Sequence, residues 1–268
     1  MKAGFAEIDI TPPIGTEKIG WIKKIVGDKV LDPLFAHAAY LSNEASKIAL
    51  LQLDILSINR TLVRCIRERV EKEHGLKPGQ LMVSATHNHS GPALVTFGET
   101  TCNPKYTEEF LDKCVKVVGQ AIGNAVDADI GSGSMFEWRV AFNRRVVMRD
   151  GTVKTHHPFS DKESLFIEGP IDPEVAAIAV RSKSGELLGC LVNFSCHPVH
   201  HGGEPSFSAG FPGVLAKKLK EAGCPITLYL NGACGNLHTH NPASTDIGME
   251  LAGTMLAEDI LAIISSLQ

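Results

Sequence analysis

The spacing of apolar residues predicts two stretches of chain with the same order of elements: a β-hairpin, an amphipathic helix and a strand. Alternating apolar positions indicate each hairpin, and apolar positions three and four residues apart indicate each helix. In the first stretch these elements are expected at residues 35–56, 59–75 and 81–85. In the second they are expected at residues 175–194, 208–223 and 226–230. Each stretch runs into a His-x-His sequence, His87-Asn88-His89 and His238-Thr239-His240.

The remaining pattern adds an opening strand that ends at Thr11-Pro12-Pro13 and an amphipathic helix over residues 104–126. Short strands are expected across residues 130–155, a polar loop over 156–173 and a last helix over 244–267. No linker or change in composition divides the chain. We therefore predict a single α/β domain over residues 1–268, in which two pseudo-repeated hairpin-helix-strand halves surround a mixed β-sheet core with helices outside.

Charge and composition narrow the range of functions. With 26 Lys and Arg against 30 Asp and Glu, the chain lacks the basic footprint of a nucleic-acid-binding protein. No apolar run reaches the roughly 18 residues of a membrane span. Glu7 stands where a secretory signal needs apolar residues, and the seven cysteines include no Cys-x-x-Cys pair. We expect a cytoplasmic protein that acts on a small molecule, without a nucleic-acid or membrane partner.

Histidine is the residue type that points to chemistry. Nine of the eleven histidines lie in four short clusters: His87/His89, His156/His157, His197/His200/His201 and His238/His240. Three of the clusters follow predicted strands, the arrangement expected where ligands gather at one edge of an α/β sheet. Imidazole-rich ligation suits zinc, manganese, iron or nickel better than magnesium or calcium. The sequence therefore predicts a bound divalent metal.

Several of these residues also have simpler interpretations. In an extended segment, residues two apart point the same way, so both histidines of a His-x-His sequence can face one cation. Alternatively, one binds metal while the other faces substrate, or both are hydrogen-bonded loop residues. His156 is more typical of a surface residue than of a ligand. Asp54, at the end of a hairpin strand, can orient an imidazole, bind metal or cap a loop.

Six motifs, taken together, resemble the N-terminal catalytic domain of the neutral/alkaline, non-lysosomal ceramidase family. The most specific are Thr86-His87-x-His89-Ser90-Gly91-Pro92 and Asn193-Phe194-x-x-His197-Pro198. The others lie at residues 6–13, 143–145, 169–174 and 231–236, so the resemblance spans nearly the whole chain. The family consists of zinc hydrolases that cleave an amide bond. The resemblance implies that His87 and His197 are metal ligands, that His89 lies beside the reacting carbonyl and that Arg144 contacts the substrate.

The departures from the family pattern are as informative as the matches. The family's remaining metal ligands, a Glu and a Tyr, come from sequence beyond the residues that align here. The family's active-site serine is replaced by His238, and Ser208-Ala209-Gly210 lacks the acid that related sequences carry. His238 and His240 stand where replacement ligands can come from. A site of His87, His197 and one or both of these histidines would leave a position open for water.

We therefore predict a metal-dependent hydrolase that cleaves an amide or lactam bond of a small polar substrate by metal-activated water. His87, His197 and His238 are the predicted ligands. His89 or His240 is the acid–base group or a further ligand, and Arg144 stabilises an oxyanion or holds a substrate carboxylate. A dinuclear phosphoesterase and a non-catalytic metal-binding protein are the alternatives. Because part of the family's ligand set is missing, a homo-oligomer that completes the site is also possible.

Overall fold

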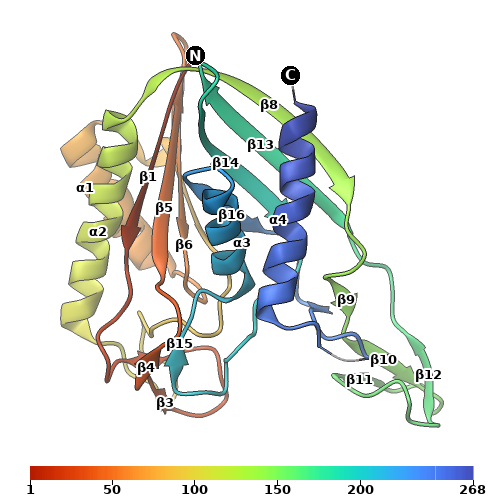
Figure 1. Ribbon diagram of the computed structural model, residues 1–268. Helices are drawn as coiled ribbons and strands as arrows, with labels where there is room; N and C mark the ends of the chain where they lie inside the picture. The colour runs from red at the N-terminus through yellow and green to blue at the C-terminus, as the bar shows by residue number, and fades with distance from the viewer. Residues whose placement is uncertain (245, 268) are drawn as a thin grey trace.

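The structure is a computed structural model that describes residues 1–244 and 246–267. Apart from the additional strands in its loops, the chain passes twice through the same order of elements: three strands, a helix, a strand and a helix (Figure 1). The first half comprises β1 (Lys2–Asp9), β5 (Phe35–Ser42), β6 (Lys47–Leu53), α1 (Arg60–His74), β7 (Leu81–Ala85) and α2 (Pro104–Gly123). The second half comprises β8 (Val126–Phe136), β13 (Glu174–Ser182), β14 (Leu187–Phe194), α3 (Gly210–Glu221), β16 (Thr227–Asn231) and α4 (Met249–Ser266).

One sheet of eight strands runs through both halves in the order β16-β14-β13-β8-β1-β5-β6-β7. Outward from the middle, each half has two antiparallel junctions followed by a parallel one. The halves join where β1 pairs with β8, at Lys2 with Asp127 and Ala3 with Val126. This mixed sheet confirms the predicted α/β fold with repeated halves. Each repeat is longer than the sequence pattern indicates, by one strand at its start and one helix at its end.

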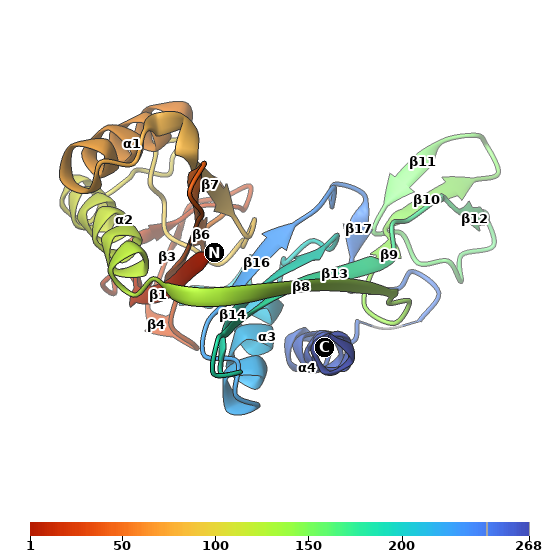
Figure 2. The ribbon, with the colours of Figure 1, turned by 90° about the horizontal axis from the view of Figure 1, so that it is seen from above.

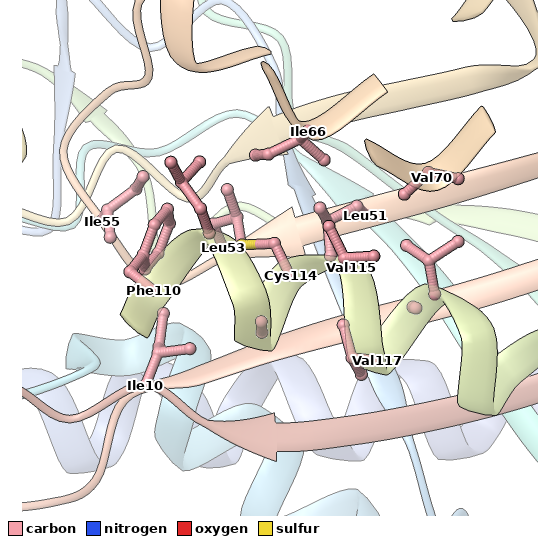
Figure 3. Close-up of a cluster of buried hydrophobic side chains, with 14 of the residues drawn as sticks. Ile10, Leu51, Leu53, Ile55, Ile66, Val70, Phe110, Cys114, Val115 and Val117 are labelled. Carbon is pink, nitrogen blue, oxygen red and sulfur yellow. The ribbon is translucent and has the colours of Figure 1, made fainter. Parts of the chain in front are cut away.

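Alternation along the strands sorts side chains into three apolar clusters. Leu51 and Leu53 of β6 face α1 and α2, where they pack with Phe110, as Figure 3 shows. In the second half, the corresponding faces of β13 and β14 pack against α3 and α4. The opposite strand faces meet each other in a smaller third cluster that includes Phe5 and Leu228. The helix pairs therefore lie on the two outer sides, with strands of both halves between them (Figure 2).

The structure corrects three details of the predicted elements. The range 130–155 contains the predicted short strands at residues 142–143, 145–148 and 153–155, but it opens with β8, one strand of 11 residues that begins at Val126 and pairs with β13 over nearly its whole length. The expected polar loop over 156–173 contains the strand β12 (Ser164–Ile167), which pairs with β10 (Arg145–Met148). The last helix begins at Met249, several residues later than expected. By contrast, Asn59 and Gly75 cap α1 as the sequence predicts.

Additional short strands pair with one another in the loops that connect the elements of the large sheet. They are β2 (Glu17–Lys18), β3 (Ile25–Val26), β4 (Lys29–Val30), β9 (Phe142–Asn143), β11 (Val153–Thr155), β15 (Ser206–Phe207) and β17 (Leu237–His238), with a 3-10 turn at Pro78–Gln80. The pairing of β17 with β9 matters most for the site, because it holds His238 beside the segment that carries Arg144. Among the helices of the described residues, none has both the length and the apolar character needed to cross a bilayer.

Candidate metal centre

Three histidines from the two halves come together beside the ends of their strands. His87 and His89 follow β7 of the first half, and His197 follows β14 of the second. The ring centroids of His87 and His197 are 4.6 Å apart, and those of His89 and His197 are 4.9 Å apart. One ring nitrogen from each residue lies within 4.8 Å of the others, which is close enough for all three to contact one metal ion.

Backbone carbonyls fix the tautomer of each of these rings. Nδ1 of His87 donates to the Leu56 carbonyl at 3.0 Å, and Nδ1 of His89 donates to the Gly20 carbonyl at 2.6 Å. Nδ1 of His197 donates to the carbonyl of Cys234 at 3.2 Å. A carbonyl oxygen can only accept, so in each neutral ring the proton lies on Nδ1 and Nε2 carries a lone pair.

The Nε2 atoms of His89 and His197 are only 3.0 Å apart. With both protons held on Nδ1, no hydrogen remains to bridge these two nitrogens, so two lone pairs face each other. A cation between them would turn this repulsion into attraction. The donor set therefore fits a metal ion that accepts imidazole nitrogen.

Burial favours the neutral form of His89 and His197, which is the form that binds metal. Burial lowers the pKa of His197 to about 4, and it likewise lowers the pKa of His89 to about 4. His87 adopts a left-handed backbone conformation, with φ of 66°, which is uncommon for a residue that is not glycine. The surrounding loop therefore holds His87 in a conformation that orients its ring toward the other two.

The three histidines open onto a cavity of about 1170 Å³. Trp21 and Phe97 form an apolar part of its wall, and Phe97 is 76% exposed. The polar part of the wall includes Lys23, Arg144 and His238. This volume suits a small-molecule ligand, and the mixed lining suits a substrate with both polar and apolar groups.

Arg144 and His238 occupy the same region of the cavity wall. The guanidinium of Arg144 donates to the Gly235 carbonyl at 2.7 Å and to Nε2 of His156 at 3.2 Å. The His156 ring lies perpendicular to the His238 ring, with centroids 5.0 Å apart. Partial burial lowers the pKa of Arg144 below its usual range, which reflects the cost of a desolvated positive charge.

The structure brings the predicted residues together with two differences, at His238 and His240. His89, rather than His238, completes the group of three with His87 and His197. His238 and Arg144 line the same cavity, so the ligand role of His238 stays a prediction. His240 is not among the residues that line the cavity, and its backbone N–H donates to Nδ1 of His238 at 2.8 Å.

Two further residues have roles that local sequence does not reveal. His156, which sequence favours as a surface residue, is exposed but accepts the hydrogen bond of Arg144. Asp32 places a carboxylate beside Ser208-Ala209-Gly210, where it accepts hydrogen bonds from Ser208 Oγ at 2.5 Å and Ala209 N at 2.6 Å. The Asp32 contacts join segments that only the tertiary fold brings together, whereas Arg144 and His156 flank the paired strands β10 and β11 of one hairpin.

Asp54 lies away from the cavity lining. It is 3% exposed, and its carboxylate accepts hydrogen bonds from Phe35 N at 2.9 Å and Gln52 Nε2 at 2.9 Å. Burial raises the pKa of this carboxyl group. Of the three interpretations that the sequence leaves open, these contacts match a loop cap.

Comparisons with known proteins bear on the fold. No family model matches the chain, and no curated protein matches it. Among solved structures, it is similar to neutral ceramidase from Pseudomonas aeruginosa, with a TM-score of 0.78 and 18% identity over 99% of this chain and 45% of that one. A ceramidase complexed with C2 has a TM-score of 0.79 and 17% identity, over 99% and 44% of the two chains. The chain thus has a ceramidase-like fold and spans less than half the length of these proteins.

Proposed function

We propose that this protein is a metal-dependent hydrolase that cleaves a carbon–nitrogen bond, an amide or a lactam, in a small polar substrate. The observation that carries the proposal is the convergence of three imidazole lone pairs from His87, His89 and His197 at one wall of a cavity. Two nitrogen ligands of a tetrahedral zinc ion, each at about 2.0–2.1 Å, lie roughly 3.3 Å apart. The 3.0 Å between Nε2 of His89 and Nε2 of His197 is close to that spacing.

The three histidines supply a ligand set that leaves room for reaction. Three protein ligands are typical of catalytic zinc sites, in which the fourth position remains open. A metal held there supplies Lewis-acid chemistry, which lowers the pKa of a water molecule and polarises a carbonyl. The carbonyls of Leu56, Gly20 and Cys234 orient the three rings. Such partners maintain the geometry and basicity of metal-binding histidines.

The resemblance to ceramidases makes an amide the first substrate class to test. The polar wall around Arg144 and Lys23 supports a substrate with polar groups. A dinuclear phosphoesterase needs carboxylate ligands, and Asp54 is buried with its oxygens engaged away from the cavity. A closed structural metal site is disfavoured because the three histidines line a cavity of about 1170 Å³.

Metal analysis combined with substitution tests this proposal. Purified protein dialysed against zinc should hold one zinc per chain by elemental analysis. His87→Ala and His197→Ala should each lose this zinc and at least about 100-fold in activity, because even residues that only support metal ligands contribute 10–100-fold. The matched control is His157→Ala, whose ring contacts Asp161 at 2.8 Å and does not line the cavity.

Circular dichroism should show the same fold in all four proteins. Activity is then measured on paired panels of small amides and phosphoesters. Wild-type protein that binds neither zinc nor manganese would contradict the metal site. Hydrolysis of phosphoesters alone would contradict the proposed bond type and leave the metal site standing.

A further inference from the structure

We infer that His238 donates a hydrogen bond to the substrate rather than binding the metal, and that with Arg144 it forms a subsite for a carboxylate group of the substrate. This inference rests on the proposed function, because it names the substrate class of the same cavity. The inference is supported by a chemical difference between two walls of the cavity. One consists of imidazole lone pairs, and the other consists of N–H donors.

The tautomer of His238 is opposite to that of the three clustered histidines. Its Nδ1 accepts the backbone N–H of His240 at 2.8 Å, so this nitrogen carries the lone pair. A neutral imidazole has one protonated nitrogen, and in His238 it is therefore Nε2. The pairing of His238 with Phe142 fixes the backbone in the position that maintains this contact. A nitrogen that carries a proton donates hydrogen bonds and cannot bind a metal.

The donor nitrogen of His238 has no partner within residues 1–244 and 246–267. His238 is 7% exposed and lines the cavity. Its Nε2 is not one of the fully buried polar atoms that lack a hydrogen-bond partner among the described residues, so this nitrogen remains accessible to solvent. Its remaining contact with solvent is therefore inside the cavity. The perpendicular packing against His156, at 5.0 Å, limits rotation of the ring. His238 thus presents a fixed N–H donor to whatever occupies the cavity.

Arg144 brings a positive charge to the same wall without a carboxylate partner. Among the described residues, no acidic oxygen lies within 4.0 Å of its guanidinium, which contacts only the Gly235 carbonyl and His156. Lys24 differs, because it pairs with Glu17 at 2.7 Å. A partly buried charge without a counter-ion is costly, and an anionic ligand would offset that cost.

The shape of the donor set favours a carboxylate. An arginine side chain presents its N–H groups in a planar fork that matches the two oxygens of a carboxylate. Arg144 donates from Nη2 to Gly235 and from Nη1 to His156, which leaves a second N–H on each of these two nitrogens, whereas Nε is buried without a partner among the described residues. The backbone N–H of Arg144 donates to the Asn236 carbonyl at 2.9 Å, which ties its segment to the loop that leads to His238. The substrate class is therefore a small amide that also carries a carboxylate.

Two matched probes test the carboxylate subsite. N-acetylglycine and N-acetylglycinamide share the amide and differ in whether the terminal group is a carboxylate. Binding to zinc-loaded protein and to metal-free protein is followed by the fluorescence of Trp21, which lines the cavity. Wild-type protein should prefer N-acetylglycine about 10-fold or more in both forms, because hydrogen bonds to charged groups are the strong ones. Arg144→Gln should abolish that preference, because it should weaken binding of N-acetylglycine much more than binding of N-acetylglycinamide.

Substitutions at His238 distinguish a donor from a metal ligand. Gln places an amide N–H near the position of Nε2, and Leu removes the donor. His238→Gln should therefore keep most of the preference for N-acetylglycine, whereas His238→Leu should lose several-fold. Both variants should retain full zinc content. His240→Ala is the matched control, because it preserves the backbone N–H that contacts His238.

The outcomes separate this inference from the proposed function. Loss of zinc in both His238→Gln and His238→Leu would identify His238 as a ligand and overturn the donor role. Equal binding of the two probes by wild-type protein, or an undiminished preference in Arg144→Gln, would overturn the carboxylate subsite. Failure of wild-type protein to bind zinc would instead contradict the proposed function, and the probe preference of the metal-free protein would still be measured.

Discussion

The two halves repeat one scaffold but end their equivalent strands in different chemistry. β6 of the first half leads into Asp54, whose carboxylate accepts hydrogen bonds from Phe35 N and Gln52 Nε2. β14 of the second half ends at Phe194, and His197, three residues later, lines the cavity. The scaffold thus offers comparable strand ends in both halves. The side chain that follows the strand decides whether that end caps a loop or takes part in a site.

The parallel edge strands differ in a second way. His87 and His89 lie directly after β7, whereas His238 follows β16 only after a turn and is held by the pairing of β17 with β9. As a result, the first half contributes two imidazole lone pairs and the second half contributes one, together with the donor wall of Arg144 and His238. The cavity is therefore chemically asymmetric although the strands around it repeat.

The largest expected effect tests whether the two halves fold as one unit. Phe110→Ala removes a buried ring from the first half, and Phe211→Ala removes one from the second, each at a cost of about 3–5 kcal/mol. Because the third cluster joins strands of both halves, each variant should show a single urea transition at a lower midpoint. Two separate transitions in either variant would indicate halves that unfold independently.

A smaller effect should separate the two strand ends. Asp54→Ala leaves the buried donors of Phe35 and Gln52 without partners, at about 1–3 kcal/mol for each unsatisfied group. Because His197 lines the cavity, His197→Ala should change the unfolding free energy of metal-free protein by about 1 kcal/mol or less. Urea denaturation in the presence of a chelator measures both. The reverse order of the two effects would contradict the assignment of Asp54 as a structural cap.

The last prediction concerns pH and the second half. Nε2 of His200 donates to Thr239 Oγ1 at 3.2 Å. Its Nδ1 is buried and has no hydrogen-bond partner among the described residues. Burial lowers the pKa of His200 from about 6.5 to about 4. The unfolded chain therefore binds a proton that the folded chain does not, and stability present above pH 6.5 is lost as pH falls toward 4.

Replacement of this ring should reduce that dependence. In His200→Gln, the slope of unfolding free energy between pH 6.5 and 4 should fall by up to about 1.36 kcal/mol per pH unit, the value for one proton. Chemical denaturation at several pH values, with wild-type protein alongside, measures the difference. Identical slopes would show that His200 is not a source of the pH dependence.

Sequence predicts the parts of this molecule that depend on local pattern. The hairpins, the caps of α1 and the positions of His87 and His197 after strands all follow from residues near them in the chain. Other features depend on distant segments. The tautomer of His89 is set by the carbonyl of Gly20, 69 residues away, and the carboxylate that contacts Ser208 comes from Asp32, 176 residues away. The length of β8 likewise depends on its partner strand.

The connection between the halves gives the molecule a natural point of division. Only Asn124 and Ala125 separate α2 from β8, and β1 meets β8 through just two residue pairs. A chain cut at this joint would leave His87 and His89 on one fragment and His197 on the other. Fragments that reassemble would restore the three-histidine group, so metal uptake would report directly on their complementation.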